Sequence, residues 1–241
     1  MSSDSTTDSP QVLLEIDQRG QLHQRGLADV EIAIATLSGG AIEAVPGPQS
    51  GDDQAIRFPA FSSADDYPRA VIAVTNAGEQ DALTPAASDF SFGAEFTLDP
   101  ISTSKVPQNV DNGDNLLQRG LSSDPAMFKL EIDGHRPACT VRGTDGTLIV
   151  RSNTEVVPGT WYRVTCARQG DEVTIEVTPA GEDPDPKTAR SKTGTIGNVR
   201  IADPKTPLSV GGKLARNGAV IASATDQFNG MVLRPFFTVD S

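Results

Sequence analysis

The chain has 241 residues, of which 20 are Lys or Arg and 32 are Asp or Glu, so its net charge is −12 and its pI is near 4.5. Nucleic acids and anionic lipid surfaces are bound through clustered positive charge, and this balance argues against both as partners. No stretch approaches the roughly 20 apolar residues of a membrane span, which argues against membrane insertion.

The first ten residues are polar and acidic, and they contain no basic-then-apolar export signal. This composition predicts a disordered tail over residues 1–10. Two origins fit such a start: a cytoplasmic protein, or the mature form of an exported protein with an added Met1. The opening resembles the low-complexity linker that often follows a removed export signal, so we expect a secreted protein.

Alternation of apolar and polar residues predicts β-strands along the rest of the chain. A period of two puts one set of side chains on a core face and the other in water. The strand candidates, separated by Gly and Pro turns, are residues 12–16, 29–37, 55–58, 70–74, 90–98, 128–133, 147–151, 158–166, 173–178, 208–212 and 231–239. We find no apolar stripe with helical period and no composition break. We therefore expect one all-β domain over residues 11–241, an antiparallel two-sheet sandwich.

The two cysteines, Cys139 and Cys166, lie in strand-like segments on either side of the strand predicted at residues 147–151. A disulfide between them would close a loop of roughly 28 residues and stabilise the fold by roughly 3–4 kcal/mol on the chain-entropy model. Two unrelated buried thiols are the alternative, because free Cys is often interior. A bond would indicate an oxidising compartment.

Several short segments, taken in order, resemble the concanavalin A-like jelly roll in its laminin-G-like form. They are Ala55-Ile56-Arg57-Phe58, Asp89-Phe90-Ser91-Phe92, Gly159-Thr160-Trp161-Tyr162-Arg163-Val164-Thr165-Cys166, Pro207-Leu208-Ser209-Val210-Gly211-Gly212 and Asp226-Gln227-Phe228-Asn229-Gly230. The resemblance covers residues 11–240. It departs from the family pattern at Leu233, where relatives usually have Asp.

The resemblance implies a two-sheet jelly roll. In secreted actinobacterial relatives a Cys commonly stands where Cys166 does and pairs with one upstream, so the resemblance also implies a Cys139–Cys166 disulfide. It assigns Trp161, Phe228 and Gly230 to the structural core of the sandwich rather than to ligand contact.

Glycosidases of the same superfamily place Glu-x-Asp-x-x-Glu on one strand, with the nucleophile and the acid ~5–5.5 Å apart. The chain has the first half of this motif at Glu15-Ile16-Asp17 and at Glu131-Ile132-Asp133, but Gly20 and Arg136 stand where the second Glu belongs. We therefore predict no catalytic residues, and we expect Glu131 and Asp133 to form the solvent side of a strand. No nucleophile elbow, zinc motif or phosphate-binding loop is present.

Calcium is the one candidate cofactor. Ca²⁺ takes six to eight oxygen ligands, and the segment from Asp111 to Asn115 supplies four side-chain oxygens in five residues. The segment is too short for an EF-hand loop, and Asp-Asn-Gly is also ordinary turn chemistry. The candidate ligands are Asp111, Asn112, Asp114 and Asn115. The acidic loop at residues 182–185 is the next candidate.

Three functional hypotheses follow. The leading one is a secreted, non-catalytic binding or adhesion module that recognises an extracellular glycan or protein surface. The second is a polysaccharide-degrading enzyme, either a divergent glycosidase or a lyase. The third is a structural subunit of an extracellular or viral assembly, in which the sandwich packs against copies of itself as a homo-oligomer. Carbohydrate modules usually present exposed aromatic rings, and one Trp with two Tyr favours protein binding or assembly.

Overall fold

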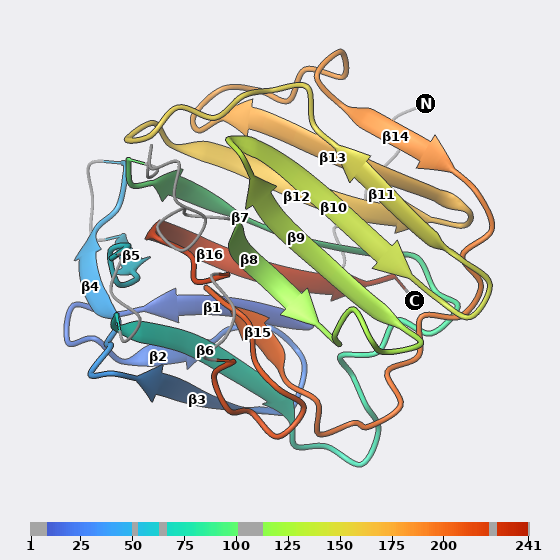
Figure 1. Ribbon diagram of the computed structural model, residues 1–241, viewed down its shortest axis with the longest axis horizontal. Helices are drawn as coiled ribbons and strands as arrows, with labels where there is room; N and C mark the ends of the chain where they lie inside the picture. Colours follow the sequence, from blue (N-terminus) through green and yellow to red (C-terminus); the bar gives the residue numbers. More distant parts are fainter. Residues whose placement is uncertain (1–8, 50–52, 63–66, 101–112, 222–225, 241) are drawn as a thin grey trace.

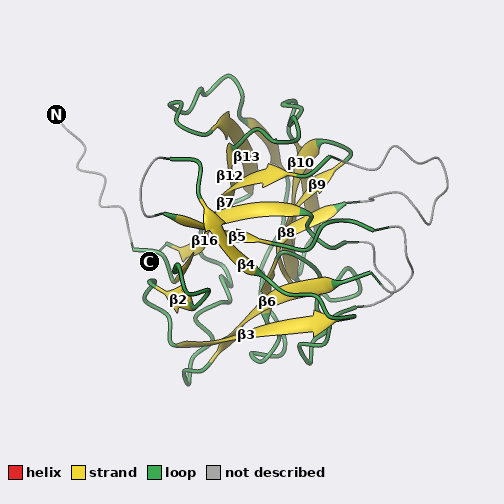
Figure 2. Cartoon of the chain, turned by 90° about the vertical axis from the view of Figure 1, so that its left-hand side faces the viewer, coloured by secondary structure: helices red, strands yellow, loops and turns green. Residues whose placement is uncertain are grey.

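The computed structural model of the protein describes residues 9–49, 53–62, 67–100, 113–221 and 226–240, so most of the predicted tail lies outside the described residues. Within these ranges the chain forms sixteen strands and no helix. The strands make two antiparallel sheets that pack face to face (Figures 1 and 2). The predicted all-β, two-sheet jelly roll is confirmed. None of the described residues forms a helix that could span a membrane.

The nine-stranded sheet contains β1 (Val12–Ile16), β2 (Leu22–Gln24), β4 (Glu43–Pro46), β5 (Gln54–Arg57), β7 (Phe90–Leu98), β12 (Tyr162–Gln169), β13 (Glu172–Pro179), β14 (Arg190–Thr193) and β16 (Gly230–Val239). Its order is β14-β13-β12-β7-β16-β1-β2, with β5 pairing to both β16 and β4. β16, the last strand in sequence, therefore lies between β1, the first, and β7.

The seven-stranded sheet contains β3 (Val30–Leu37), β6 (Arg69–Asn76), β8 (Asp114–Arg119), β9 (Met127–Asp133), β10 (Arg136–Arg142), β11 (Thr147–Arg151) and β15 (Leu208–Val210). Its order is β11-β10-β9-β8-β15-β6-β3. Gly134 and His135, both with positive φ, form the two-residue turn between β9 and β10, as a tight antiparallel hairpin requires.

Phenylalanine packing joins the two sheets. Phe128 of the seven-stranded sheet lies among three rings of the nine-stranded sheet: its centroid is 5.0 Å from Phe92, 5.2 Å from Phe237 and 5.5 Å from Phe90. All four rings are buried. Tilted and offset ring pairs at such separations add to the stabilisation that burial alone provides.

The disulfide predicted between Cys139 and Cys166 is present, and it joins the two sheets. Cys139 is on β10 and Cys166 is on β12, and their Cα atoms are 5.8 Å apart. Both residues are fully buried. The bond is therefore a covalent tie across the core.

Trp161 lies outside the core, contrary to the expectation from the sequence. β12 begins at Tyr162, and Tyr162, Val164 and Cys166 are buried while the residues between them are more exposed. Because side chains alternate along an extended chain, Trp161 falls on the outer side, where it is half-buried. Tyr162 takes the inner place, with its ring 6.1 Å from that of Phe96.

Phe228 and Gly230 both lie inside the sandwich. Phe228 is fully buried and packs against Phe58 and Phe96, with ring centroids 5.9 and 6.3 Å away. A Cβ on Gly230 would lie 2.1 Å from the carbonyl oxygen of Thr97. A side chain at position 230 would thus push β16 away from β7.

Arg119, at the end of β8, is a charged residue with no exposed surface. Its guanidinium donates to Asp81 Oδ2, Thr84 Oγ1 and the carbonyl oxygen of Thr206, each at 3.0 Å. Burial lowers the pKa of Arg119, and the Asp81 carboxylate opposes this shift, so the group stays charged. These bonds fix the loops that contain Asp81 and Thr206 against the end of β8.

We predict that Phe128→Ala lowers the free energy of unfolding by about 3–5 kcal/mol, because it opens a cavity among three rings. Urea unfolding measures the change. Ile149→Ala, at a side chain that is 52% exposed on β11, is the control and should change stability by less than about 0.5 kcal/mol. Similar losses in the two variants would contradict this packing.

We predict that the unfolded, unreduced protein has no titratable thiol. Replacing both Cys139 and Cys166 by Ala should lower the free energy of unfolding by roughly 3–4 kcal/mol. Thiol titration in denaturant, with and without reductant, checks the first statement. Two reactive thiols per unreduced chain would show that the bond does not form.

Candidate functional site

β16 changes neighbours halfway along its length. One of its edges pairs with β7, with a register shift between Leu233 and Phe236. On the other edge, β5 pairs with residues 231–232 and β1 pairs with residues 236–237. Arg234 lies between these two partners with φ at 49°, a conformation uncommon for residues other than Gly. Such bulges redirect side chains, and this one places Arg234 on the exposed face of the nine-stranded sheet.

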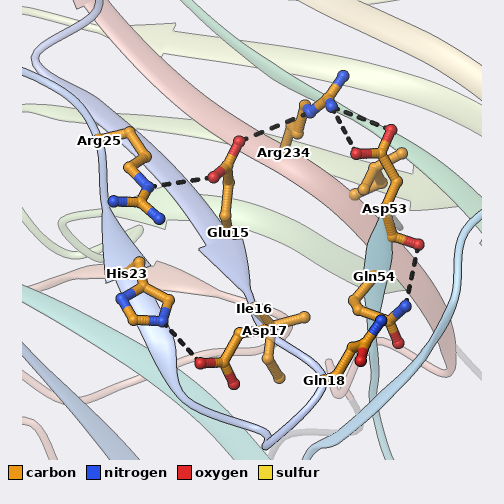
Figure 3. A pocket seen from close by; sticks show the side chains of 10 residues that line it. Glu15, Ile16, Asp17, Gln18, His23, Arg25, Asp53, Gln54 and Arg234 are labelled. Atoms are coloured by element: carbon orange, nitrogen blue, oxygen red, sulfur yellow. Dashed lines mark hydrogen bonds and ion pairs between the residues drawn. The ribbon is translucent and has the colours of Figure 1, made fainter. Parts of the chain in front are cut away.

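Arg234 joins two carboxylates from separate segments, Glu15 on β1 and Asp53 just before β5. Its Nη2 donates to both carboxylate oxygens of Asp53, at 2.8 and 3.0 Å, and its Nε is 3.8 Å from Glu15 Oε1. Glu15 Oε2 in turn accepts a hydrogen bond from Arg25 Nε at 3.1 Å. The four side chains form a row of alternating charge, Arg25–Glu15–Arg234–Asp53 (Figure 3). All are partly exposed, so the row contributes under about 1 kcal/mol per pair to stability.

Asp17 closes the hairpin between β1 and β2. Its Oδ1 accepts hydrogen bonds from the backbone N–H groups of Gln21 and Arg19, at 2.9 and 2.8 Å, and its Oδ2 is 3.0 Å from His23 Nε2. These bonds, led by that from Gln21, hold the pKa of Asp17 below its usual value. A lowered folded-state pKa means that the carboxylate stabilises the hairpin at neutral pH, and that this contribution is lost as the pH falls through that pKa.

These groups line what we call the polar groove, a depression of about 480 Å³. Its other lining residues are Ile16, Gln18, Gln54 and Leu233. Figure 3 shows polar and charged side chains from β1, β2 and β16, and from the residues next to β1, β2 and β5, around this depression. Leu233, where the resemblance noted in the sequence departs from the laminin-G-like pattern, is one of these lining residues.

A second depression, which we call the apolar hollow, adjoins the groove at Arg234. Its volume is about 260 Å³, and its apolar lining includes Pro10, Leu13 and Phe236. Arg163 and Glu95 form one wall, with Arg163 Nη2 donating to Glu95 Oε1 at 2.8 Å. The groove and the hollow together are the bulge surface. The sequence analysis did not indicate the bulge surface, because its lining residues come from five separate segments, 10–25, 53–54, 94–95, 163 and 233–238.

The other Glu-x-Asp segment lies on the opposite sheet. Glu131 and Asp133 are on the outer side of β9, as expected, and form ion pairs with Lys129 and Arg151. Arg136, which stands where a glycosidase would have its second Glu, begins β10. The arrangement is that of an amphipathic strand with paired charges.

Only half of the predicted calcium loop can be assessed, since Asp111 and Asn112 lie outside the described residues. Asp114 and Asn115 are not on an exposed turn: they begin β8 and are buried. Asp114 Oδ1 accepts a hydrogen bond from the backbone N–H of Asn229 at 2.7 Å, and Asn115 Nδ2 donates to Gln118 Oε1 at 3.1 Å. Asp114 thus connects β8 to the segment that enters β16.

Two further carboxylates approach this rim at Gly113. A Cβ on Gly113 would lie 3.8 Å from Glu131 Oε2 and 4.0 Å from Asp226 Oδ1. Lys129 pairs with Glu131, and Lys213 Nζ lies 3.1 Å from Asp226 Oδ2. Within the described ranges no three His, Cys, Asp or Glu side chains are grouped to hold a metal ion. Here lysine ammonium groups neutralise the carboxylates, so these residues fit a calcium site poorly.

We predict that Asp114→Ala lowers the free energy of unfolding by about 1–3 kcal/mol, because it leaves the buried N–H of Asn229 unpaired. Thermal melts in EDTA and in millimolar Ca²⁺ should show this loss in both buffers. Asp183→Ala, on an exposed loop, is the control and should match the parent. If Asp114 served only a metal, its replacement would be harmless in EDTA.

The family model described as Laminin G domain matches residues 115–234. No curated protein matches the chain by sequence. The binding domain of botulinum neurotoxin serotype G superposes with a TM-score of 0.61 at 9% identity, covering 96% of this chain and 48% of that chain. The enzymatically active domain of tailspike protein 2 of bacteriophage CBA120 gives 0.53 at 13% identity, with coverages of 94% and 31%. Domains LG4–5 of the mouse laminin α1 chain give 0.51 at 13% identity, with coverages of 84% and 45%.

The chain therefore spans less than half the length of each of these three structures, and at such low identity the likeness concerns the fold. The match to the Laminin G domain model is more specific for a family than these structural likenesses, because it is made from the amino-acid sequence. It runs from β8 into β16 and includes strands of both sheets. The two-sheet jelly roll and this match together show that the chain carries a laminin-G-like domain of the concanavalin A-like fold.

Proposed function

We propose that this domain is a secreted, non-catalytic module that binds an extracellular protein through the bulge surface. The observation that carries the proposal is the position of Arg234, where a row of four charges meets an apolar hollow containing Phe236. Arginine and aromatic side chains are the residues most enriched among those that dominate binding at protein interfaces. The ion pairs and the hollow lie on the exposed face of the sheet, so they add nothing to the packing of the core on its other face.

The chemistry of the surface favours a protein partner over a glycan. Among the described residues that line the groove and the hollow, Phe236 is the only Phe, Tyr or Trp, so the surface offers no extended platform for stacking sugar rings. Carboxylates and guanidinium groups alternate along the groove, and they suit charged partner side chains. The net charge of −12 would steer basic partners toward the chain and repel acidic ones.

Two further observations support the proposal. A botulinum neurotoxin binding domain and laminin domains share the fold, which supports a binding role. The inter-sheet disulfide supports an oxidising, extracellular location, because such bonds are rare in the cytosol.

A polysaccharide-degrading enzyme is the second candidate, because Glu15 and Asp17 both face the polar groove and a tailspike enzyme shares the fold. The bonds these carboxylates make argue for structural roles. Glu15 is shared between Arg25 and Arg234, and Asp17 holds the hairpin turn. Freeing either for proton transfer would break these contacts.

We predict that Arg234→Gly weakens binding at least about 30-fold, which corresponds to the 2 kcal/mol typical of a dominant interface residue. Glycine accepts the positive φ, so the variant removes the side chain and should keep or slightly raise the melting temperature. Arrays of extracellular proteins and of glycans identify the ligand for the parent chain. Titration of that ligand then compares the variants.

Arg151→Ala is the matched control, because Arg151 also pairs with a carboxylate, Asp133, but lies on the other sheet. Its affinity should equal that of the parent. If Arg234→Gly and the parent chain bound the identified ligand with equal affinity, the bulge surface would not be the binding site. Turnover of a polysaccharide that Glu15→Gln abolishes in a folded protein would establish the enzyme instead.

A further inference from the structure

Among the described residues the two sheets have five edge strands, β2, β4 and β14 in the nine-stranded sheet and β3 and β11 in the other. Four of these five edges are protected, and β4 has only four residues and ends in Pro46. Unpaired backbone N–H and C=O groups on an edge invite pairing with another strand, and proteins block this with short strands, charges or a covering segment. β2 has three residues, and β14 exposes Arg190 and Lys192. β11 ends in Arg151 and lies against β14, where the two sheets approach each other.

The remaining edge, β3, is the least protected, because it is long and nearly uncharged, and it approaches β2 of the other sheet less closely than β11 approaches β14. It is eight residues long, and its sequence, Val-Glu-Ile-Ala-Ile-Ala-Thr-Leu, has one charge and neither Pro nor Gly. It pairs with β6 along its whole length and is the last strand of its sheet. Among the described residues, no backbone hydrogen bond joins residues 30–36 to anything other than β6. Figures 1 and 2 both show β3 at the boundary of the molecule.

The side chains of β3 also favour pairing. Ile34 is 43% exposed, although it lies on the core side of the strand, opposite Ile72 of β6. Ala33 and Thr36 are exposed as well. On a chain of net charge −12, an edge with a single carboxylate brings little like charge together when a second, equally acidic copy pairs with it.

We propose that two copies of this chain dimerise by antiparallel pairing of β3 with β3, which joins the two seven-stranded sheets into one. Two-fold symmetry about an axis normal to the sheet keeps the two core-facing sides aligned. A register centred on Ile34 puts Ile34 opposite its counterpart and Ala33 opposite Ala35. It puts Glu31 opposite Leu37, so the two Glu31 carboxylates lie at opposite ends of the pair.

This interface is separate from the bulge surface, because β3 and β16 belong to different sheets. A dimer formed through β3 would leave both bulge surfaces open and present two of them at once. Two linked sites raise the apparent affinity for a repetitive partner surface without any new contact. The proposal of a dimer and the proposal of a binding function can therefore be tested, and disproved, independently of each other.

Single-cysteine variants test the register directly. In the proposed register the two Ile34 Cα atoms are about 4.5–5.5 Å apart, within the range that a disulfide spans. Ile34→Cys should therefore give a covalent dimer under mild oxidation. Thr36→Cys is the matched control, on the same face of the same strand, and its two copies lie about 13 Å apart. It should remain uncrosslinked on a non-reducing gel.

Sedimentation of the full chain at several concentrations measures the non-covalent dimer. The parent and Ile149→Lys, a charge added on the protected β11 edge, should both dimerise, whereas Ile34→Lys, which places like charges opposite each other, should be monomeric. A parent chain that stays monomeric would overturn the proposal, even if its β3 edge bound an added extended peptide instead of a second copy. So would a dimer that survives Ile34→Lys, or crosslinking of Thr36→Cys as fast as that of Ile34→Cys.

Discussion

The insertion of Phe128 among Phe90, Phe92 and Phe237 determines more than the stability of the sandwich, because it fixes which way β16 must face. Val232 and Phe237 both point into the core, opposite Phe96 and Phe92 of β7. They are five residues apart, and in a regular strand residues an odd number apart face opposite sides. β7 covers the same distance in four residues. One extra residue must therefore be accommodated in β16, and the bulge at Arg234 is the result.

The bulge surface is thus a consequence of the core. Because β16 bends at the extra residue, β1 and β5 pair with different halves of it and leave a gap between them. Arg234 fills this gap and pairs with a carboxylate from each side, while Phe236 turns outward next to the inward Phe237. The inter-sheet disulfide and the buried Arg119 pair hold the layers that make this geometry rigid. A binding surface on rigid strands needs little ordering when a partner arrives.

The alternation of apolar and polar residues predicted strands correctly where one face of the strand is buried and the other is exposed to solvent. The strand predicted at residues 90–98 matches β7, and residues 173–178 fall within β13. β8 was not recognised as a full strand, since Asp114 and Asn115 are polar but buried, and an irregular register follows them. The prediction that Trp161 is in the core was wrong, because the side chains of β12 that point inward begin with its neighbour, Tyr162.

The bulge surface could not be predicted in the same way. Val232 and Phe237 are apolar and five positions apart, a spacing that is consistent with an extra residue in the strand. This spacing identifies a bulge only once the register of β16 against β7 is known. The groove then requires Glu15, Asp53 and Arg234 to meet, and they come from residues far apart in the sequence. Arg119 likewise reads as an ordinary charged residue until the loop that contains Asp81 closes over it.

The most direct test of this account is a footprint of the bound partner, measured as the change in backbone hydrogen exchange when the ligand identified on the arrays is added. If the partner binds the bulge surface, exchange should slow only on the exposed face around the bulge, at the β1–β2 hairpin and at residues 233–236, and β8 to β11 should be unchanged. Protection centred on the outer face of the seven-stranded sheet, around Lys129 and Glu131, would contradict it.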